Sequence, residues 1–316
     1  MKCILRLRVI VLSCVSVLLA SCAVNMPKID VPDVQPVNNK VAKLKEANHH
    51  PDVALVLGGG GARGYAHLGV LTVLVNHHVP INLIVGASAG SIMGSLYADK
   101  ADIKHATQVM MSAKFFDIAD VSIHGGMSGS HLERFILKNV QAKNFSDLKV
   151  PLIAATTDLQ TGATYPISGG PIAPAVLASA AVPGLVFPVK LYGKTLVDGG
   201  AVDNVPDDVA KLYKPKVLIA VNIDKTLPKE LPTSNFGVLN RAYLLMYRRY
   251  FKLYMKEYPP TVMIRPQVGQ VSLFDIKDKH HLFCLGKTAA LKKMNEIMQQ
   301  LCANNIKLTN GQSACS

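Results

Sequence analysis

The chain has 316 residues, of which 49% are hydrophobic and 17% charged, and this composition supports a sizeable buried core rather than a disordered chain. The formal net charge is +13, but no run of Lys and Arg has the density of a nucleic-acid-binding arm, so nucleic acid is not expected as a partner. The six cysteines include no Cys-x-x-Cys pair, which argues against a structural zinc site.

The first residues have the pattern of a secretory targeting segment. Basic residues precede an apolar run, 9–19, that is too short to span a bilayer comfortably. The following Leu19-Ala20-Ser21-Cys22 resembles the lipobox of bacterial lipoproteins, which implies cleavage before Cys22 and acylation of that cysteine. Because Ala23 rather than Asp comes next, the resemblance favours a lipid-anchored protein of the bacterial outer membrane. The alternative is an ordinary signal peptide with an unrelated cysteine.

The expected domain organisation follows from these patterns. Residues 1–21 are a signal peptide, and residues 22–50 are the acylated cysteine and an extended tether, since this stretch contains three prolines and no sustained period. Residues 51–305 form one domain, followed by a C-terminal tail, 306–316.

A glycine-rich loop lies between an expected buried strand, 53–57, and an expected helix, 65–75. Its pattern Gly59-x-Gly61-x-x-Gly64 would suit dinucleotide binding, but no acidic residue occurs between Asp52 and Asp99 to hold a ribose hydroxyl. The second interpretation is an oxyanion hole, because successive glycines leave backbone N–H groups unshielded ahead of a helix N-terminus. The third is a tight turn without a ligand, although consecutive glycines are costly in chain entropy.

The stretch Gly86-x-Ser88-x-Gly90 lies between an apolar run, 81–85, and a helical run, 92–98. Strand, G-x-S-x-G and helix is the context of a nucleophile elbow, in which Ser88 takes an unfavourable backbone conformation at a tight turn. Glycines on either side leave room for that crowding. Ser88 is therefore a candidate nucleophile. The elbow and the glycine loop are expected at the carboxyl ends of neighbouring parallel strands, where open α/β sheets place their sites.

The remaining elements complete an α/β pattern. Two helices are expected within 99–149, divided near Gly125, Gly126 and Gly129. Further strands are expected at 150–156, 190–197 (as strand-turn-strand), 217–223 and 262–265, and further helices at 173–181 and 282–301. The fold class is thus α/β, with a mainly parallel central sheet sandwiched by helices. Cys302 and Cys315 are candidates for a disulfide, which would leave Cys284 unpaired.

The hydroxyl of Ser88 needs a base, and two arrangements are open. Ser88, Asp198 and His280 or His281 follow the chain order of an α/β-hydrolase triad, but the two histidines lie in a charge-rich stretch typical of a solvated turn. The other arrangement is a dyad, in which Asp198 takes the serine proton directly. A dyad requires that the turn Asp198-Gly199-Gly200 hold the carboxylate in a dry site.

The glycine loop, the elbow and the aspartate turn together resemble the patatin-like phospholipase family, over about residues 52–220 and more loosely to 300. The resemblance implies a three-layer patatin-like fold with Ser88 as nucleophile and Asp198 as its partner in a dyad. It also implies an oxyanion hole made by the N–H groups of Gly59, Gly60 and Gly61, with Arg63 nearby.

The same resemblance implies the chemistry. The expected reaction is hydrolysis of acyl esters in phospholipids or lysophospholipids at a membrane surface, without metal or cofactor. Two alternatives remain: a Ser-His-Asp esterase of soluble esters, and a non-catalytic envelope lipoprotein.

Residues 241–258 predict an amphipathic helix ended by Pro259-Pro260. Its aromatic residues fall within a stripe of roughly 100°, and Lys and Arg gather on much of the other side. The aromatic stripe is Tyr243, Tyr247, Tyr250, Phe251, Tyr254 and Tyr258. Either this stripe packs on the domain and the cations are solvated, or the helix lies among lipid headgroups as a second membrane contact beside Cys22.

Overall fold

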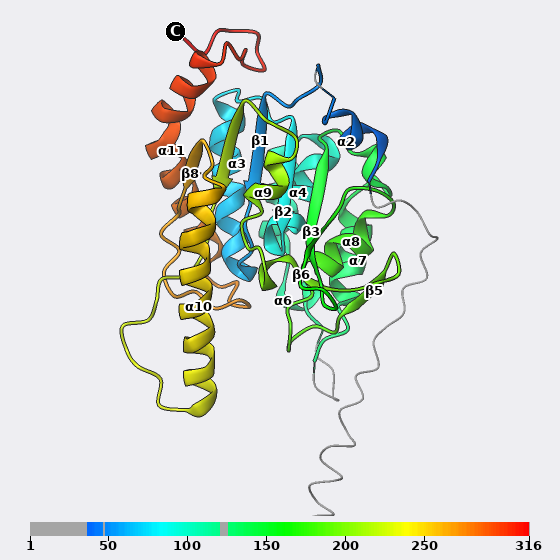
Figure 1. Cartoon of the computed structure of the whole chain (residues 1–316), viewed down its shortest axis with the longest axis vertical. Helices are drawn as coiled ribbons and strands as arrows, with labels where there is room; N and C mark the ends of the chain where they lie inside the picture. Colours follow the sequence, from blue (N-terminus) through cyan, green and yellow to red (C-terminus); the bar gives the residue numbers. More distant parts are fainter. Residues whose placement is uncertain (1–36, 47, 121–125, 316) are drawn as a thin grey trace, which may run out of the picture.

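The computed structural model describes residues 37–46, 48–120 and 126–315, so the expected signal peptide and Cys22 lie outside the described residues. A central eight-stranded sheet has the order β5-β6-β3-β2-β1-β7-β8, with β4 paired to β3 (Figure 1). The strands are β1 (Val53–Leu57), β2 (Leu83–Ala87), β3 (Leu152–Asp158), β4 (Thr164–Ile167), β5 (Val189–Leu191), β6 (Lys194–Asp198), β7 (Val217–Val221) and β8 (Val262–Ile264).

Helices cover both faces of this sheet (Figure 1). They are α2 (Asn39–Lys43), α3 (Tyr65–Asn76), α4 (Ala89–Lys100), α5 (Ile103–Ser112), α6 (Phe115–Ile118), α7 (Ser130–Asn139), α8 (Ile172–Ser179), α9 (Asp207–Lys211), α10 (Asn235–Glu257) and α11 (Lys279–Ala303). Short 3₁₀ turns follow β1 (η1, Gly61–Gly64), precede β3 (η2, Phe145–Asp147) and follow β6 (η3, Gly199–Ala201).

The centre of the sheet is parallel and buried on both faces. β1 pairs in parallel with β2 and β7, β2 with β3, and β7 with β8, whereas β4 and β6 run antiparallel to β3. Every residue of β1, β2 and β7 is buried, as continuous runs of Val, Leu, Ile and Ala predict for strands covered by helices on both sides. The mainly parallel α/β sandwich expected from the sequence is therefore confirmed.

Two expectations for the secondary structure were wrong. Residues 99–149 contain α5, α6 and α7 rather than two helices. The strand β4 was not expected at all, because it is short, mostly half-buried and contains Pro166, which limits it to a sheet edge.

The expected boundaries at both ends of the domain also need correction. Within the expected tether, Val41 of α2 is fully buried, and Lys40 Nζ donates to Leu148 O at 3.1 Å. In the expected tail, Ile306 and Leu308 are buried. The packed domain therefore includes residues 37–46 and the C-terminal segment. Only a few buried side chains attach each segment, so neither has a hydrophobic period in its sequence.

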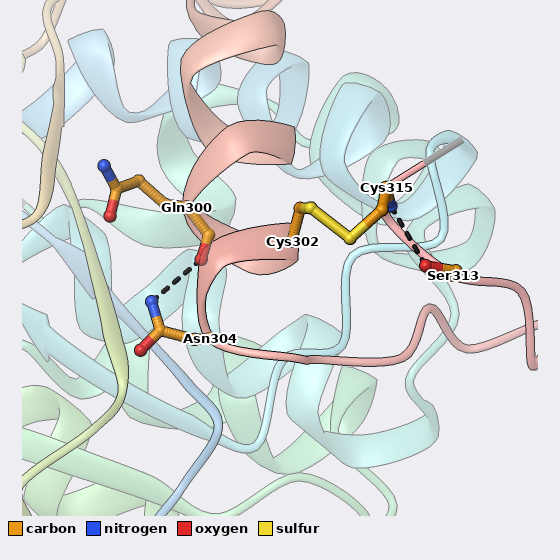
Figure 2. Close-up of a disulfide and its surroundings, with 5 residues drawn as sticks. All are labelled: Gln300, Cys302, Asn304, Ser313 and Cys315. Carbon is orange, nitrogen blue, oxygen red and sulfur yellow. Dashed lines mark hydrogen bonds between the residues drawn. A yellow bond between two sulfur atoms is a disulfide. The ribbon is translucent and has the colours of Figure 1, made fainter.

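A disulfide attaches the C-terminal segment to the end of α11. Cys302 and Cys315 are joined across 13 residues of sequence, and the Cys315 N–H donates to Ser313 Oγ (Figure 2). Cys284 is free and exposed, as expected.

Replacing Cys302 by Ser is expected to lower the free energy of unfolding by about 3 kcal/mol, the value for closing a loop of this length in the unfolded chain. Thermal unfolding under non-reducing conditions measures it. The matched control is Cys284→Ser, which removes an unpaired thiol and is expected to leave the melting temperature unchanged. An equal loss in both variants would contradict a stabilising disulfide.

Helix α10 divides the expected aromatic stripe between two environments. Tyr254 is buried, with hydrogen bonds to Asp208 and Asp203, and Tyr247 donates to Asp224 Oδ2 at 2.8 Å. Tyr243, by contrast, is 49% exposed. The stripe is thus neither wholly packed nor wholly free, and the helix begins at Asn235 rather than at residue 241.

Candidate active site

Ser88 occupies a strained turn between β2 and α4. Its backbone has φ 52° and ψ −121°, a conformation that a side chain disfavours. The Ser88 N–H donates to both the carbonyl and the hydroxyl oxygen of Ser179 at 3.1 Å, and Ser179 Oγ donates to Ala155 O at 2.7 Å. Ser179 at the end of α8 therefore holds the elbow in place, a role that its position in the sequence does not reveal.

The elbow glycines permit contacts that no other residue allows. A Cβ on Gly90 would lie 1.9 Å from Leu57 O, and one on Gly86 would lie 2.6 Å from the backbone of Gly90. Helix α4 therefore presses directly on the end of β1. Gly64 serves a similar purpose, because its Cβ would lie 2.9 Å from Ala89 Cβ.

Strand β3 brings Asp198 beside Ser88. Ala87, at the end of β2, pairs with Ala155 of β3, and Asp198, at the end of β6, pairs with the next residue, Thr156. A Cβ on Gly199 would lie 2.4 Å from Ala155 O and 3.3 Å from Ala87 Cβ, so the turn after Asp198 packs against the elbow.

Asp198 is only 4% exposed, and its two carboxylate oxygens have different surroundings. The Gly200 N–H donates to Oδ1 at 2.7 Å, whereas Oδ2 meets no fully aligned hydrogen-bond partner among the described residues. Burial raises the pKa of Asp198 to about 6, and hydrogen bonding from the Ser88 side chain and the Gly200 N–H opposes this rise. Near pH 7 the group is therefore ionised but more basic than an exposed aspartate, which suits a general base.

The oxyanion-hole expectation needs one correction. The Gly59 N–H donates to Asn204 O at 2.9 Å and is not available to a substrate. Within the described part of the chain, the N–H groups of Gly60 and Gly61 have no such partner. The Ala89 N–H is a third free donor at the first position of α4, and it directly follows the nucleophile, where serine hydrolases place an oxyanion donor.

Asn204 connects the glycine loop to the aspartate turn. Its Nδ2 donates to Gly59 O at 3.2 Å and to Asp224 Oδ1 at 2.9 Å. Its Oδ1 lies where it would contact a Cβ on Gly59 at 2.3 Å or on Gly200 at 2.4 Å. The motifs do not reveal this residue, although it lies six positions after Asp198 (204 − 198).

Replacing Asn204 by Ala is expected to lower kcat about tenfold with little change in KM, because the glycine loop loses a hydrogen bond worth about 1–1.5 kcal/mol. Steady-state hydrolysis of a soluble ester measures both parameters. Tyr247→Phe is the control, since it removes the donor to Asp224 Oδ2 but leaves the hydrogen bond from Asn204 to Gly59 O in place, and it should have a smaller effect. A change confined to KM would argue against a positioning role.

Arg63 supports the loop from behind. Its Nε donates to Ile223 O at 2.9 Å and its guanidinium NH1 donates to Val271 O at 3.0 Å. Burial lowers the pKa of Arg63, and the charge of Asp224 opposes this effect. Arg63 therefore lies near the oxyanion donors, as expected, but its hydrogen bonds hold the neighbouring loops.

Ser88 opens onto a cavity of about 910 Å³ that includes space open to solvent. Most of its walls are apolar, and they include Tyr65, Ile92, Met110, Leu132, Leu177 and Phe274. An elongated apolar group bound there would place its end beside the nucleophile.

The histidines of the possible triad lie elsewhere. His280 and His281 are exposed in the first turn of α11, and no histidine is among the described residues that line the cavity. Buried His67 contacts Gly58 O at 2.7 Å, and burial lowers its pKa to about 4. Asp198 is thus the titratable group that the structure places beside Ser88.

In the described ranges, no group of three or more His, Cys, Asp or Glu residues is arranged to hold a metal ion. No helix in those ranges combines the length and hydropathy needed to span a bilayer.

The chain is similar to known proteins in sequence and fold. Residues 55–211 match the family model described as patatin-like phospholipase. Patatin-like phospholipase domain-containing protein 6 of Homo sapiens is 32% identical over 207 residues, which are 62% of this chain and 15% of that protein. Lysophospholipase NTE1 of Mycosarcoma maydis is 31% identical over 188 residues, 56% of this chain and 10% of that protein.

The matched region is thus a small part of these relatives. Among solved structures, VipD from Legionella pneumophila has a TM-score of 0.54 at 15% identity, covering 79% of this chain and 67% of that one, which shows a shared fold. Through residues 55–211, which hold the glycine loop, the elbow and the aspartate turn, the chain belongs to the patatin-like phospholipase family.

Proposed function

We propose that this chain is a serine lipid acyl hydrolase that uses a Ser88–Asp198 dyad on phospholipid or lysophospholipid esters. The observation that carries the proposal is a strained serine beside a buried carboxylate, at the mouth of a large apolar cavity. The names of the family and of the matched lysophospholipase support the substrate class.

In the proposed mechanism, the acyl chain occupies the apolar cavity and its ester carbonyl lies over Ser88. Asp198 accepts the Ser88 proton as Oγ attacks the carbonyl carbon. The N–H groups of Gly60, Gly61 and Ala89 stabilise the tetrahedral oxyanion, an effect worth roughly 3 kcal/mol for each donor.

The tetrahedral intermediate then collapses. The ester C–O bond breaks, and the leaving alcohol takes the proton from Asp198. Asp198 next accepts a proton from water, which attacks the acyl-serine. The second tetrahedral intermediate collapses by breaking its bond to Ser88 Oγ, which takes the proton back from Asp198. The products are a fatty acid and free Ser88, with Asp198 ionised again.

A membrane location is part of the proposal. Acylation of Cys22 would hold the domain at the bacterial outer membrane, close to a lipid substrate. The lipobox-like Leu19-Ala20-Ser21-Cys22 supports it. Mass spectrometry of the N-terminal peptide tests it, and an unmodified Cys22 in the mature protein would contradict it.

The reaction is tested by fatty-acid release from a phospholipid, a lysophospholipid and a soluble short-chain ester. Release is expected from at least one lipid, and the His280→Ala/His281→Ala double variant is expected to match the wild type. Loss of activity in that variant would favour a histidine base instead. Lipid binding without release from any substrate would point to a non-catalytic lipoprotein.

A further inference from the structure

Helix α10 extends beyond the sheet at the end where the parallel strands finish and the active site lies. The helix has 23 residues, and at about 1.5 Å each it is about 34 Å long. The five residues of β7 span only about 17 Å. Because α10 returns the chain from the carboxyl end of β7 to the start of β8, its N-terminal half lies past that end. Figure 1 shows this half extending below the sheet and the other helices.

The extended half has large apolar side chains in solvent. We call the following residues the tip: Leu231 (77% exposed), in the segment just before the helix, and Val238 (54%), Leu239 (67%), Leu245 (50%) and Met246 (71%) on the helix. The inward side of the helix is occupied by Tyr247 and Tyr254, which bond Asp224 and Asp208 of the domain. Contiguous exposed apolar side chains of this kind mark an interaction surface.

A basic groove lies directly behind the tip. It is lined by Lys225, Arg248, Lys252 and Arg265, and it lies between α10 and the segments that follow β7 and β8. Its volume is about 1010 Å³, including space open to solvent. In the described part of the chain, none of these four cations has an ion pair within 4.0 Å. Asp224 also lines the groove, but its two oxygens accept hydrogen bonds from Asn204 and Tyr247.

Further apolar groups lie at the cavity or beside a residue that lines it. Phe116 of α6 is 67% exposed, and Phe274, which lines the cavity, is 39% exposed. Phe115 joins them, with its ring centroid 6.0 Å from that of Phe274. In Figure 1, α6 lies at the lower edge toward which the free half of α10 extends.

We propose that the tip of α10 inserts into an anionic phospholipid bilayer while the basic groove holds lipid headgroups, so that the Ser88 cavity faces the membrane. Met246 precedes Lys252 by about 9 Å along the helix axis. With the helix axis pointing into the membrane, this offset places Met246 about 9 Å deeper than Lys252, among the acyl chains while the cation stays at the headgroups.

A lipid surface fits these features better than a protein partner. Lys and Arg side chains without ion pairs, beside an apolar tip, complement an anionic membrane, because each of them adds to the attraction between the protein and the lipid surface. A second copy of the chain would bring like charges together. The choice of lipid also rests on the proposed function, because the cavity would then receive its substrate directly from the surface to which the tip is bound.

The chain contains no Trp, so one introduced indole reports on its own position. Met246→Trp places it in the tip. The control is Leu212→Trp, because Leu212 is 58% exposed and lies between α9 and the start of β7, at the opposite edge of the sheet. Each full-length variant is bound to vesicles of phosphatidylcholine and phosphatidylglycerol that carry brominated acyl chains.

Because an inserted residue lies about 5–10 Å deep, brominated chains are expected to quench the indole of the Met246→Trp variant about twofold. The emission of the Leu212→Trp variant is expected to stay unchanged. The readout is local to one indole, so it does not depend on how the N-terminal segment is processed. The same degree of quenching in the two variants would overturn the proposal. If neither variant is quenched, a protein partner for the tip is favoured.

Charge is tested in the Met246→Trp background. Lys252→Glu is expected to reduce the inserted fraction about fivefold on anionic vesicles, whereas Lys292→Glu, which makes the same charge change on exposed α11, is expected to have no effect. Equal effects of the two substitutions would overturn the role of the groove.

Activity then separates docking from catalysis. Leu239→Asp with Met246→Asp is expected to lower vesicle hydrolysis about tenfold and to preserve hydrolysis of a soluble short-chain ester. An equal loss on both substrates would contradict a docking role. If the wild type hydrolyses no ester, the proposed function fails, while the quenching of the Met246→Trp variant still decides whether the tip docks.

Discussion

Replacing Ser88 by Ala is expected to lower kcat for ester hydrolysis by roughly 10⁶-fold, the loss seen when a serine hydrolase loses its nucleophile. Covalent catalysis ends with the hydroxyl, because Asp198 is buried and hydrogen-bonded to the Gly200 N–H and cannot reach past the elbow to replace it. Fatty-acid release under saturating substrate measures the loss.

The matched control is Ser95→Ala, seven residues further along the chain (95 − 88). Ser95 is also buried in α4, but its hydroxyl donates to Ile92 O within the helix. This variant is expected to keep nearly full activity. Comparable losses in the two variants would show that Ser88 acts through folding rather than chemistry.

The backbone at Ser88 supplies an independent check. Because φ 52° and ψ −121° disfavour any side chain, Ser88→Gly is expected to be more stable than Ser88→Ala by about 1–3 kcal/mol while being equally inactive. Thermal unfolding of the two variants measures the difference. A lower melting temperature for Ser88→Gly would contradict strain at the elbow.

Replacing Asp198 by Asn is expected to lower kcat about 10⁴-fold, the upper end of what a general base contributes. An amide of the same shape keeps the packing but cannot accept the Ser88 proton. In the wild type, kcat/KM is expected to fall as pH drops below about 6, since burial raises the pKa of Asp198 to about 6 and the protonated acid is no longer a base. Activity at pH 5 equal to that at pH 8 would exclude Asp198 as the base.

Stability should respond in the opposite direction. The pKa of Asp198 is raised from 3.8 to about 6, so the carboxyl contributes stability at low pH that is lost as pH rises from 3.8 through about 6. Above that window Asp198→Asn is expected to be more stable than the wild type by about 3 kcal/mol. Denaturant unfolding at pH 4 and pH 8 measures this, and a gap that does not grow with pH would contradict the shift.

Local patterns were enough to predict the elements whose signal lies within a few residues. The run 53–57, the four glycines after it and Gly86-x-Ser88-x-Gly90 each contain the apolar period or the conformational freedom that their backbone requires. The parallel sheet and the elbow followed from such patterns and from their order along the chain, whereas the preference for Asp198 over His280 rested on the resemblance to the patatin-like family.

Contacts between distant segments determine which groups of these motifs are free to act. The Gly59 N–H donates to Asn204 O, 145 residues away, and is therefore not available to a substrate. The Ser88 N–H donates to Ser179, 91 residues away. The outward side of α10 likewise depends on the neighbours that cover Tyr247 and Tyr254. Residues distant in sequence determine these hydrogen bonds and this burial, so a local hydrophobic period cannot predict them.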